Sequence, residues 1–334
     1  MTLYNTLKEL CLCPSVSGRE QKIREKLSAM VAPFCDELRT DALGSLIAVK
    51  KGNGGGKKIM LAAHMDEIGL IVNYIEDNGM LRVAPIGWFS FEASAFTRVV
   101  SERGVHGALV PDTRTKPEDF PKSEFFYIDI GAKNRKQAEA KVAIGDFFVG
   151  TPVLDKLIGT RVCGRPLDDR IGCAVVLGVA EMLADEKLEN DVYYVFSVQE
   201  EFGRKGALTS AFAIQPDIAL CFDVTGTGDT PGAVPMACRL GDGAAIKVRD
   251  ASVICDENVV RAICDVAKEC NIKHQREVLL KGGTDTSSLQ MAGAGAAVGA
   301  ISIPTRSIHS GVEICDLADA ECCIKLAAEY IKRA

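Results

Sequence analysis

The fold class is decided by one stretch, which reads RIGCAVVLGVAEML (170–183), DVYYVFSV (191–198) and DIALCFDV (217–224). A long apolar run of helical length precedes two short continuous apolar runs, which are typical of buried strands. The alternation continues to the end of the chain in ENVVRAICDVAKEC (257–270), GAAVGAISI (295–303) and LADAECCIKLAAEYIKR (317–333). Alternating helices and buried strands predict an α/β fold with a mainly parallel sheet that is flanked by helices.

The pattern of apolar residues is different before this stretch, between Gly69 and Arg161. The short alternating runs there are LIVNYI (70–75), MLRVAPI (80–86), TRVVSE (97–102), GVHGALV (104–110), FFYIDI (125–130) and DFFVG (146–150). Only KNRKQAEAKVA (133–143) has a clear helical pattern. Many short strands with turns between them indicate a small barrel or sandwich. We therefore predict a discontinuous catalytic domain, residues 1–68 and 162–334, with an inserted all-β, barrel-like dimerisation domain at 69–161.

The first 68 residues fit the same α/β domain. Ser17 is a candidate cap for a helix over REQKIREKLSAMV (19–31). Two strand-like runs follow, SLIAVKK (45–51) and KKIMLAAH (57–64), joined by GNGGG (52–56). The glycines do not form a phosphate-binding loop, because Lys57 stands where that motif requires its second Gly. The pattern favours a hairpin turn instead.

Composition narrows the functional classes. The 334 residues suggest about two domains, and 47% hydrophobic with 25% charged residues is an ordinary globular balance. The net charge of −6 argues against nucleic acid or an anionic membrane as a partner. No apolar run approaches the roughly 20 residues that cross a bilayer, and the N-terminus lacks the basic head of a signal peptide. A cytoplasmic protein is expected.

The 13 cysteines raise the alternative of an oxidised, secreted scaffold. Their number is odd, no CxxC pair exists, and several lie inside apolar runs, such as Cys173 and Cys221. Reduced thiols that pack as small core residues are therefore expected.

Candidate catalytic and ligand residues lie at the ends of the predicted strands. Among the four histidines, His64 and His309 end apolar runs, and Glu200–Glu201 and Asp223 end two others. Asp168–Asp169 directly precedes the first long helix of the stretch above. Each feature alone has an ordinary explanation, such as a satisfied polar residue or a helix cap. Because ligands bind outside the carboxyl ends of parallel strands, five such features together predict one site.

These residue types favour a metal site. Imidazole and carboxylate ligands suit zinc or a similar divalent ion, and their number exceeds what one tetrahedral zinc uses. A dinuclear site with a bridging carboxylate, its metals about 3.5–4 Å apart, accounts for the surplus. Asp66 lies on the same strand face as His64 and can fix its tautomer. One carboxylate of the Glu200–Glu201 pair can bind metal while the other accepts a proton from water.

Six motifs make this picture specific: AHMDEIG (63–69), GRPLDDRIG (164–172), VQEEFGRKGA (198–207), FDVTGTGDTPG (222–232), KGGTDTSSLQ (281–290) and IPTRSIHSGVEI (303–314). In this order they resemble the tetrahedral aminopeptidases. These are dinuclear-zinc exopeptidases with glutamyl and leucyl-type members, some of them labelled endoglucanase or cellulase M. The similarity extends from the first helix to the last and includes the position of the β insertion.

The resemblance implies a role for each site residue. The implied metal ligands are His64, Asp168, Glu201, Asp223 and His309, with Asp168 bridging two ions. Glu200 is implied as the general base, and Asp66 as the residue that orients His64. The family pattern usually has Tyr where this chain has Ser307, next to a ligand, which bears on the shape of the pocket. His106 and His274 match no motif and are expected to be structural or surface residues.

The expected function is a metal-dependent aminopeptidase that removes N-terminal residues from short peptides, with two divalent ions per subunit, Zn²⁺ or alternatively Co²⁺ or Mn²⁺. The resemblance also implies a homo-oligomer, in which the insertion forms dimers and six dimers form a dodecamer. A carboxypeptidase or N-acyl deacylase on the same site is an alternative. A glycosidase, which needs two carboxylates about 5–9.5 Å apart, and a non-catalytic oligomeric peptide-binding protein are further alternatives.

Overall fold

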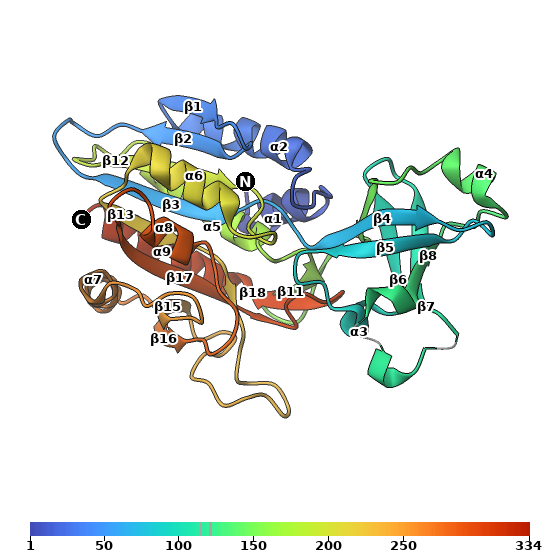
Figure 1. Ribbon diagram of the computed structural model, residues 1–334. Helices are drawn as coiled ribbons and strands as arrows, with labels where there is room; N and C mark the ends of the chain where they lie inside the picture. Colours follow the sequence, from blue (N-terminus) through green and yellow to red (C-terminus); the bar gives the residue numbers. More distant parts are fainter. Residues whose placement is uncertain (114, 120–121) are drawn as a thin grey trace.

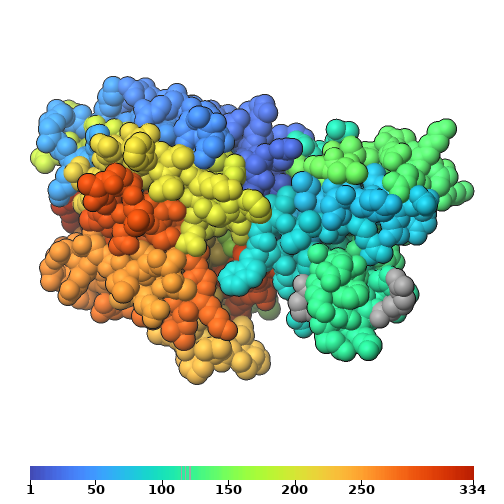
Figure 2. All heavy atoms as spheres, in the orientation of Figure 1, coloured from blue at the N-terminus to red at the C-terminus, as the bar shows by residue number. Residues whose placement is uncertain are grey.

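The computed structural model describes residues 1–113, 115–119 and 122–334. The chain forms a helix-covered sheet and a separate closed barrel, which are two lobes of the molecule (Figures 1 and 2). The α/β architecture and the inserted barrel predicted from the sequence are thereby confirmed. Both chain ends lie on the helix-covered lobe (Figure 1).

The larger sheet has 12 strands among the described residues. Its main path runs β1 (Glu37–Thr40), β2 (Leu46–Lys50), β12 (Asp191–Ser197), β3 (Lys58–His64), β13 (Ile218–Cys221), β17 (Ala297–Arg306), β18 (Glu313–Asp316), β11 (Arg161–Arg165) and β10 (Val153–Lys156). Three further strands extend it beside β17, namely β14 (Val224–Thr225), β15 (Ala244–Arg249) and β16 (His274–Val278).

The sheet is mixed, so the prediction of a mainly parallel sheet is only partly right. The four central strands β12, β3, β13 and β17 are parallel, whereas the outer pairs on both sides of the main path are antiparallel. Short buried runs such as LIAVK in β2 carry no signal of strand direction, because direction depends on the connections. The parallel centre is the part that positions the candidate site.

Two local predictions for the first 68 residues are wrong. The runs around GNGGG do not form a hairpin, because β12 lies between β2 and β3 and pairs with both. Ser17 does not cap the second helix, which begins at Gln21 after Glu20. The Ser17 hydroxyl instead donates a hydrogen bond of 2.6 Å to Asp66. This tertiary contact replaces the local cap that the sequence suggested.

Helices cover both faces of the sheet. One set packs together, with α5 in contact with β3, and comprises α1 (Leu3–Cys11), α2 (Gln21–Val31), α5 (Arg170–Leu183), α7 (Glu257–Glu269) and α9 (Leu317–Ile331). A second pair, α6 (Lys205–Ile214) and α8 (Thr286–Gln290), contacts β12, β13 and β17 (Figure 1). Helix α5 is apolar and buried along almost its whole length, because it lies between the sheet and helices α1 and α9. Its first turn is therefore held firmly in place.

The barrel is antiparallel and closed in the order β4-β5-β8-β7-β6-β9. Its strands are β4 (Gly69–Ile75), β5 (Leu81–Ile86), β6 (Thr97–Ser101), β7 (His106–Pro111), β8 (Phe126–Asp129) and β9 (Phe147–Gly150). Short helices accompany the strands: α3 (Phe91–Ser94), α4 (Arg135–Glu139), η2 (Pro117–Asp119) and η3 (Ser123–Phe125), while η1 (Ala32–Phe34) belongs to the other lobe.

The barrel has its own core, with Phe126 and Phe148 fully buried inside it. The first and last barrel strands pair directly, with Leu70 opposite Phe148. Strand β10, which the sequence analysis placed within 69–161, pairs with β11 in the larger sheet. The division into two domains that fold separately stays a prediction.

The cysteines and the two histidines outside the motifs have no special role in the structure. All 13 cysteines are free. His274 bonds to the carbonyl of Ile272, and His106 lies exposed on β7. Among the helices of the described chain, none combines the length and apolarity that a bilayer crossing requires.

Candidate metal centre and substrate pocket

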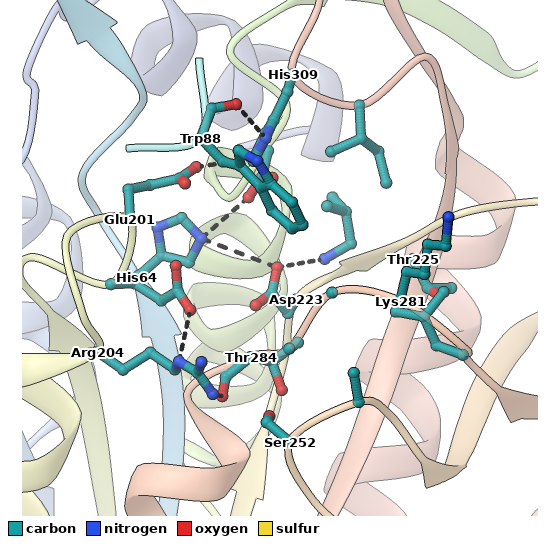
Figure 3. Close-up of a pocket in the computed structure, with 18 of the residues that line it drawn as sticks. His64, Trp88, Glu201, Arg204, Asp223, Thr225, Ser252, Lys281, Thr284 and His309 are labelled. Atoms are coloured by element: carbon teal, nitrogen blue, oxygen red, sulfur yellow. Dashed lines mark hydrogen bonds and ion pairs between the residues drawn. The ribbon is translucent and has the colours of Figure 1, made fainter. Parts of the chain in front are cut away.

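The predicted site residues come together at the carboxyl ends of the central parallel strands. His64 is the last residue of β3, Asp223 follows β13, and Glu200 and Glu201 follow β12. Asp168 precedes α5, and His309 lies between β17 and β18. Figure 3 shows His64, Glu201, Asp223 and His309 directed toward a common centre. Segments far apart in the sequence therefore converge, as the strand-end pattern indicated.

Asp168 stands between the two histidines. Its Oδ1 lies 3.0 Å from His64 Nε2, and its Oδ2 lies 3.1 Å from His309 Nε2. On the His309 side, Glu201 Oε1 is 3.2 Å from the same Nε2. On the His64 side, Asp223 Oδ1 is 3.9 Å from His64 Nε2. One carboxylate thus faces two imidazoles, each of which has a further carboxylate beside it.

The two members of the Asp168–Asp169 pair have different partners. Asp169 is the N-cap of α5, because its side chain accepts a hydrogen bond from the Gly172 N–H. It also accepts one from the backbone N–H of His64. The helix-cap alternative considered from the sequence thus describes Asp169 and not Asp168. Asp169 nevertheless forms a compact donor group with His64 and Asp223, and Asp168 forms another with His64 and Glu201.

Burial and mutual repulsion shape the charges of the carboxylates. Burial raises the pKa of Asp223 and of Asp169 well above the usual range, and neighbouring carboxylates add to the effect. Burial also raises the pKa of Glu201, with Asp168 as the next cause. Asp168 is the exception, because hydrogen bonds from both histidines outweigh burial and lower its pKa. The site therefore holds closely spaced carboxyl groups whose ionisation is costly without a cation, and a bound cation would favour their charged form.

The donor set fits divalent metal ions. Two imidazole nitrogens and several carboxylates are the ligand types that zinc and similar ions prefer. The buried Glu201 Oε1 lies 3.2 Å from His309 Nε2, and among the described residues it accepts no well-directed hydrogen bond. A metal ion would satisfy this oxygen and offset the repulsion that raises the neighbouring pKa values.

Both imidazoles are oriented through their other ring nitrogen. His64 Nδ1 lies 3.1 Å from the backbone carbonyl of Asp66 and 3.5 Å from its carboxylate. His309 Nδ1 lies 3.1 Å from the carbonyl of Trp88 in the barrel lobe. Carbonyl acceptors at Nδ1 leave Nε2 free to act as a metal ligand. The role of Trp88 had no signal in the sequence, since any residue offers a backbone carbonyl.

The Asp66 carboxylate mainly holds the Glu200–Glu201 turn. It accepts hydrogen bonds from the backbone N–H groups of both glutamates, at 3.0 and 3.2 Å, and from the Ser17 hydroxyl. Glu20 supports the same turn by accepting from the N–H of Gln199. Burial raises the pKa of Glu20 to about 7. Sequence reasoning missed Glu20, which was assigned to an ordinary helix start.

Glu200 lies beside the donor groups but belongs to neither of them. Its Oε1 is 3.9 Å from Arg204 Nε. Burial raises the pKa of Glu200 well above its usual range, and Asp285 and Glu201 contribute. A carboxylate that borders a ligand cluster without joining it is suited to accept and donate a proton.

Two further buried acids stabilise the surroundings of the site. Glu313 accepts hydrogen bonds from the N–H groups of Leu167 and His309. Asp285 lies in one of the six motifs and accepts a 2.5 Å hydrogen bond from Ser197. Burial raises the pKa of Glu313 to about 7 and that of Asp285 to about 6. The sequence gave neither acid a role, because each acts through backbone or hydroxyl groups whose positions only the fold determines.

A pocket of about 650 Å³ opens over the centre, and its lining includes His64, Asp168, Glu200, Asp223 and His309. Its opposite wall comes from residues 224–226, 251–252, 279 and 281–284. Ile308 and His309 line the pocket, whereas Ser307 is exposed and is not among the lining residues. The departure at Ser307 therefore does not reach the pocket directly.

A buried ionic network lies behind that wall. Lys247 Nζ is 2.8 Å from Glu277 Oε1 and 3.7 Å from Asp250 Oδ2. Glu277 accepts from the Thr225 hydroxyl, and Asp250 accepts from that of Thr284. Because Thr225 and Thr284 both line the pocket, this network fixes the wall opposite the predicted ligands.

Comparison with known proteins agrees with this geometry. A family model described as M42 glutamyl aminopeptidase matches residues 44–326. A putative aminopeptidase of Acetivibrio thermocellus is 44% identical over 98% of both chains. A lysyl aminopeptidase of Pyrococcus furiosus is 34% identical over 99% of this chain and 97% of the relative.

Solved structures of the same type have the same fold. An aminopeptidase of Desulfurococcus kamchatkensis superposes with a TM-score of 0.94 and 37% identity, covering 99% of this chain and 95% of the other. The Pyrococcus horikoshii TET1 peptidase, which can assemble into a tetrahedron or a large octahedral shell, gives 0.89 with 30% identity over both full chains. A Thermotoga maritima protein described as an endoglucanase gives 0.82 with 31% identity, covering 98% and 96%. The resemblance inferred from the six motifs is confirmed.

Proposed function

The chain belongs to the M42 glutamyl aminopeptidase family, a family of peptide hydrolases, and from this premise we propose that it is a metal-dependent aminopeptidase with a dinuclear site. One observation carries the proposal: the two oxygens of Asp168 face the Nε2 atoms of two different histidines at 3.0 and 3.1 Å. A carboxylate placed in this way is suited to bridge two ions.

Each ion would have ligands of its own in addition to Asp168. His64 and Asp223 would hold one ion, and His309 and Glu201 would hold the other. When bound, divalent ions act here as Lewis acids toward the scissile carbonyl and lower the pKa of water. Zn²⁺ suits the donor set, and Co²⁺ or Mn²⁺ has the same ligand preferences.

Glu200 is the general base of the proposed reaction. Its carboxylate takes a proton from the attacking water and returns it to the nitrogen of the leaving peptide, so that the peptide bond breaks as a new C–O bond forms. Asp66 positions Glu200 beside the ligand cluster by accepting a hydrogen bond from its backbone N–H. The positive α-amino group of a short peptide is attracted to the surplus carboxylates, which selects free N-termini.

Metal removal tests the function. We expect prolonged chelation to abolish the release of N-terminal residues from aminoacyl nitroanilides, and Zn²⁺, Co²⁺ or Mn²⁺ to restore it. Because ions bind only the folded site, reloading also raises the melting temperature. N-acetylated versions of the same substrates are the control, and their cleavage at a similar rate would favour the deacylase alternative. Full activity in the chelated protein would contradict the metal proposal.

The barrel lobe supports a proposal about assembly. Neither donor group draws a residue from the barrel, although Trp88 contacts His309. The related TET1 peptidase can assemble into a tetrahedron or a large octahedral shell, and we infer that this chain forms dimers that build a dodecamer enclosing the sites.

Sedimentation tests the assembly. We expect an active particle much heavier than the 35.8 kDa subunit, which cleaves short peptides and spares folded proteins. A fully active monomer at working concentration would disprove the enclosed assembly and leave the catalytic proposal intact.

A further inference from the structure

We propose that Trp88 of the barrel is a substrate-contact residue, whose indole packs on the second residue of the peptide, the one that follows the cleaved bond. This inference rests on the proposed aminopeptidase function and gives the barrel lobe a part in substrate selection. The substrates that it favours are peptides with an aromatic or bulky apolar second residue.

The backbone at Trp88 is fixed against the metal centre. The Trp88 carbonyl lies 3.1 Å from His309 Nδ1. The preceding residue, Gly87, has φ +74°, and a Cβ there would lie 2.8 Å from Ile68 Cγ2 and 3.1 Å from Glu201 Cβ. Only glycine allows the chain to pass this close to a proposed ligand. The backbone that carries the Trp88 side chain is therefore held in a fixed position beside the site.

The indole is exposed in spite of this fixed backbone. Trp88 is 72% exposed and is the single tryptophan of the chain. In Figure 3 it lies beside His309, and its ring extends over the centre. A large aromatic surface left open next to a pocket is a feature of ligand-binding sites, since its burial by a ligand is favourable.

Trp88 and His309 both line two neighbouring hollows. The larger is the pocket of about 650 Å³ described above, and the smaller, about 410 Å³, is lined by Trp88, Phe89, Ser90, Phe91, Glu92 and His309. We name the smaller one the barrel-side hollow. When a peptide bond is held at the metal centre, the side chains on its two sides enter different hollows. The larger hollow, lined by Glu200 and the wall loops, takes the side chain of the N-terminal residue. The second residue and the rest of the peptide then lie along Trp88.

The chemistry of the barrel-side hollow indicates which second residue fits. Three of its six lining residues are Trp or Phe. The two phenylalanines are nearly buried, so that their rings are held in place by the barrel core. Its one acidic residue, Glu92, is exposed. An aromatic second residue can stack on these rings and a bulky apolar one can bury its surface against them, whereas Glu92 repels an acidic one.

The kinetic test compares two dipeptide amides in the metal-loaded protein. Both begin with the residue that the wild type releases fastest, followed by phenylalanine amide in one and by glycinamide in the other. We expect Trp88→Ala to reduce the kcat/KM preference for the phenylalanine substrate about five- to tenfold, mainly through KM, and Trp88→Phe to retain most of it. Phe96→Ala is the matched control, because Phe96 is a barrel aromatic with 73% exposure that lines neither hollow.

A binding test needs no turnover. Since Trp88 is the only tryptophan, its fluorescence reports directly on this position. We expect acrylamide to quench the free protein strongly, and N-acetylphenylalanine amide to reduce that quenching while N-acetylglycine amide does not. The acetyl group prevents either probe from binding as an N-terminal residue.

The outcomes separate this inference from the proposed function. An unchanged substrate preference in Trp88→Ala, or an indole that acrylamide cannot reach because a second subunit covers it, would overturn the role of Trp88 while the enzyme still releases N-terminal residues. A metal-loaded wild type that cleaves neither dipeptide would instead overturn the proposed function.

Discussion

We expect Glu200→Gln to lower kcat about 10²- to 10⁴-fold, the range that general acid–base catalysis contributes, while both metal ions stay bound. The amide keeps the size of the side chain and can still contact Arg204, whose Nε lies 3.9 Å from Glu200 Oε1. What it loses is the oxygen that accepts a proton from water. Metal content measured by atomic spectroscopy, together with kcat on one nitroanilide, checks this result.

Glu201→Gln is the matched control, because it makes the same chemical change one residue later. Glu201 Oε1 is 3.2 Å from His309 Nε2 and belongs to a donor group, whereas Glu200 does not. We therefore expect Glu201→Gln to lose metal, with activity that recovers partly at high metal concentration. Metal loss in the Glu200 variant and retention in the Glu201 variant would mean that the two roles are exchanged.

The largest effect on metal binding is expected for Asp168→Ala. Among the described residues, Asp168 is the one carboxylate within 3.1 Å of both imidazoles, so its removal takes a ligand from each proposed ion. Loss of a supporting hydrogen bond alone typically weakens metal binding about 10–100-fold, and loss of a shared ligand should exceed this. Both ions and all measurable turnover are expected to be lost.

Equilibrium dialysis against Zn²⁺ measures the change in the Asp168 variant. Asp265→Ala on the surface of α7 is the control, because it alters the net charge equally and lies far from the site in the sequence and on another element. Circular dichroism establishes that the variant is folded. Two ions bound to folded Asp168→Ala with wild-type affinity would rule out the bridging role.

The clustering of His64, Glu201 and Asp223 could be predicted from the sequence because their strands are short, continuous apolar runs that each end in a polar residue. Parallel strands bring their carboxyl ends to one edge, so this inference needs no knowledge of strand order. Asp168 and Asp169 could not be distinguished in the same way. Adjacent carboxylates look equivalent in a sequence, and only the start of α5 makes one of them a cap.

Other features depended on long-range contacts that leave no local pattern. The insertion of β12 between β2 and β3 could not be deduced, because GNGGG favours a hairpin locally and carries no sign of a strand from residues 191–197. Glu20 was assigned to a helix start, yet it supports Gln199 at a separation of 179 residues. The carbonyl of Trp88 had no signal at all, since its function belongs to the backbone.

The pairing of β4 with β9 has a consequence for how the site assembles during folding. His64 and Asp168 meet at 3.0 Å although 104 residues separate them, and the barrel accounts for most of that length. Since Leu70 lies opposite Phe148, a closed barrel brings the two ends of the insertion together. By loop-closure entropy, shortening the effective loop about fourfold makes the contact between His64 and Asp168 about 1 kcal/mol less costly. The closed barrel thus lowers the entropic cost of bringing His64 to Asp168. We expect the candidate metal site, whose residues flank the insertion, to form most readily after the barrel has closed.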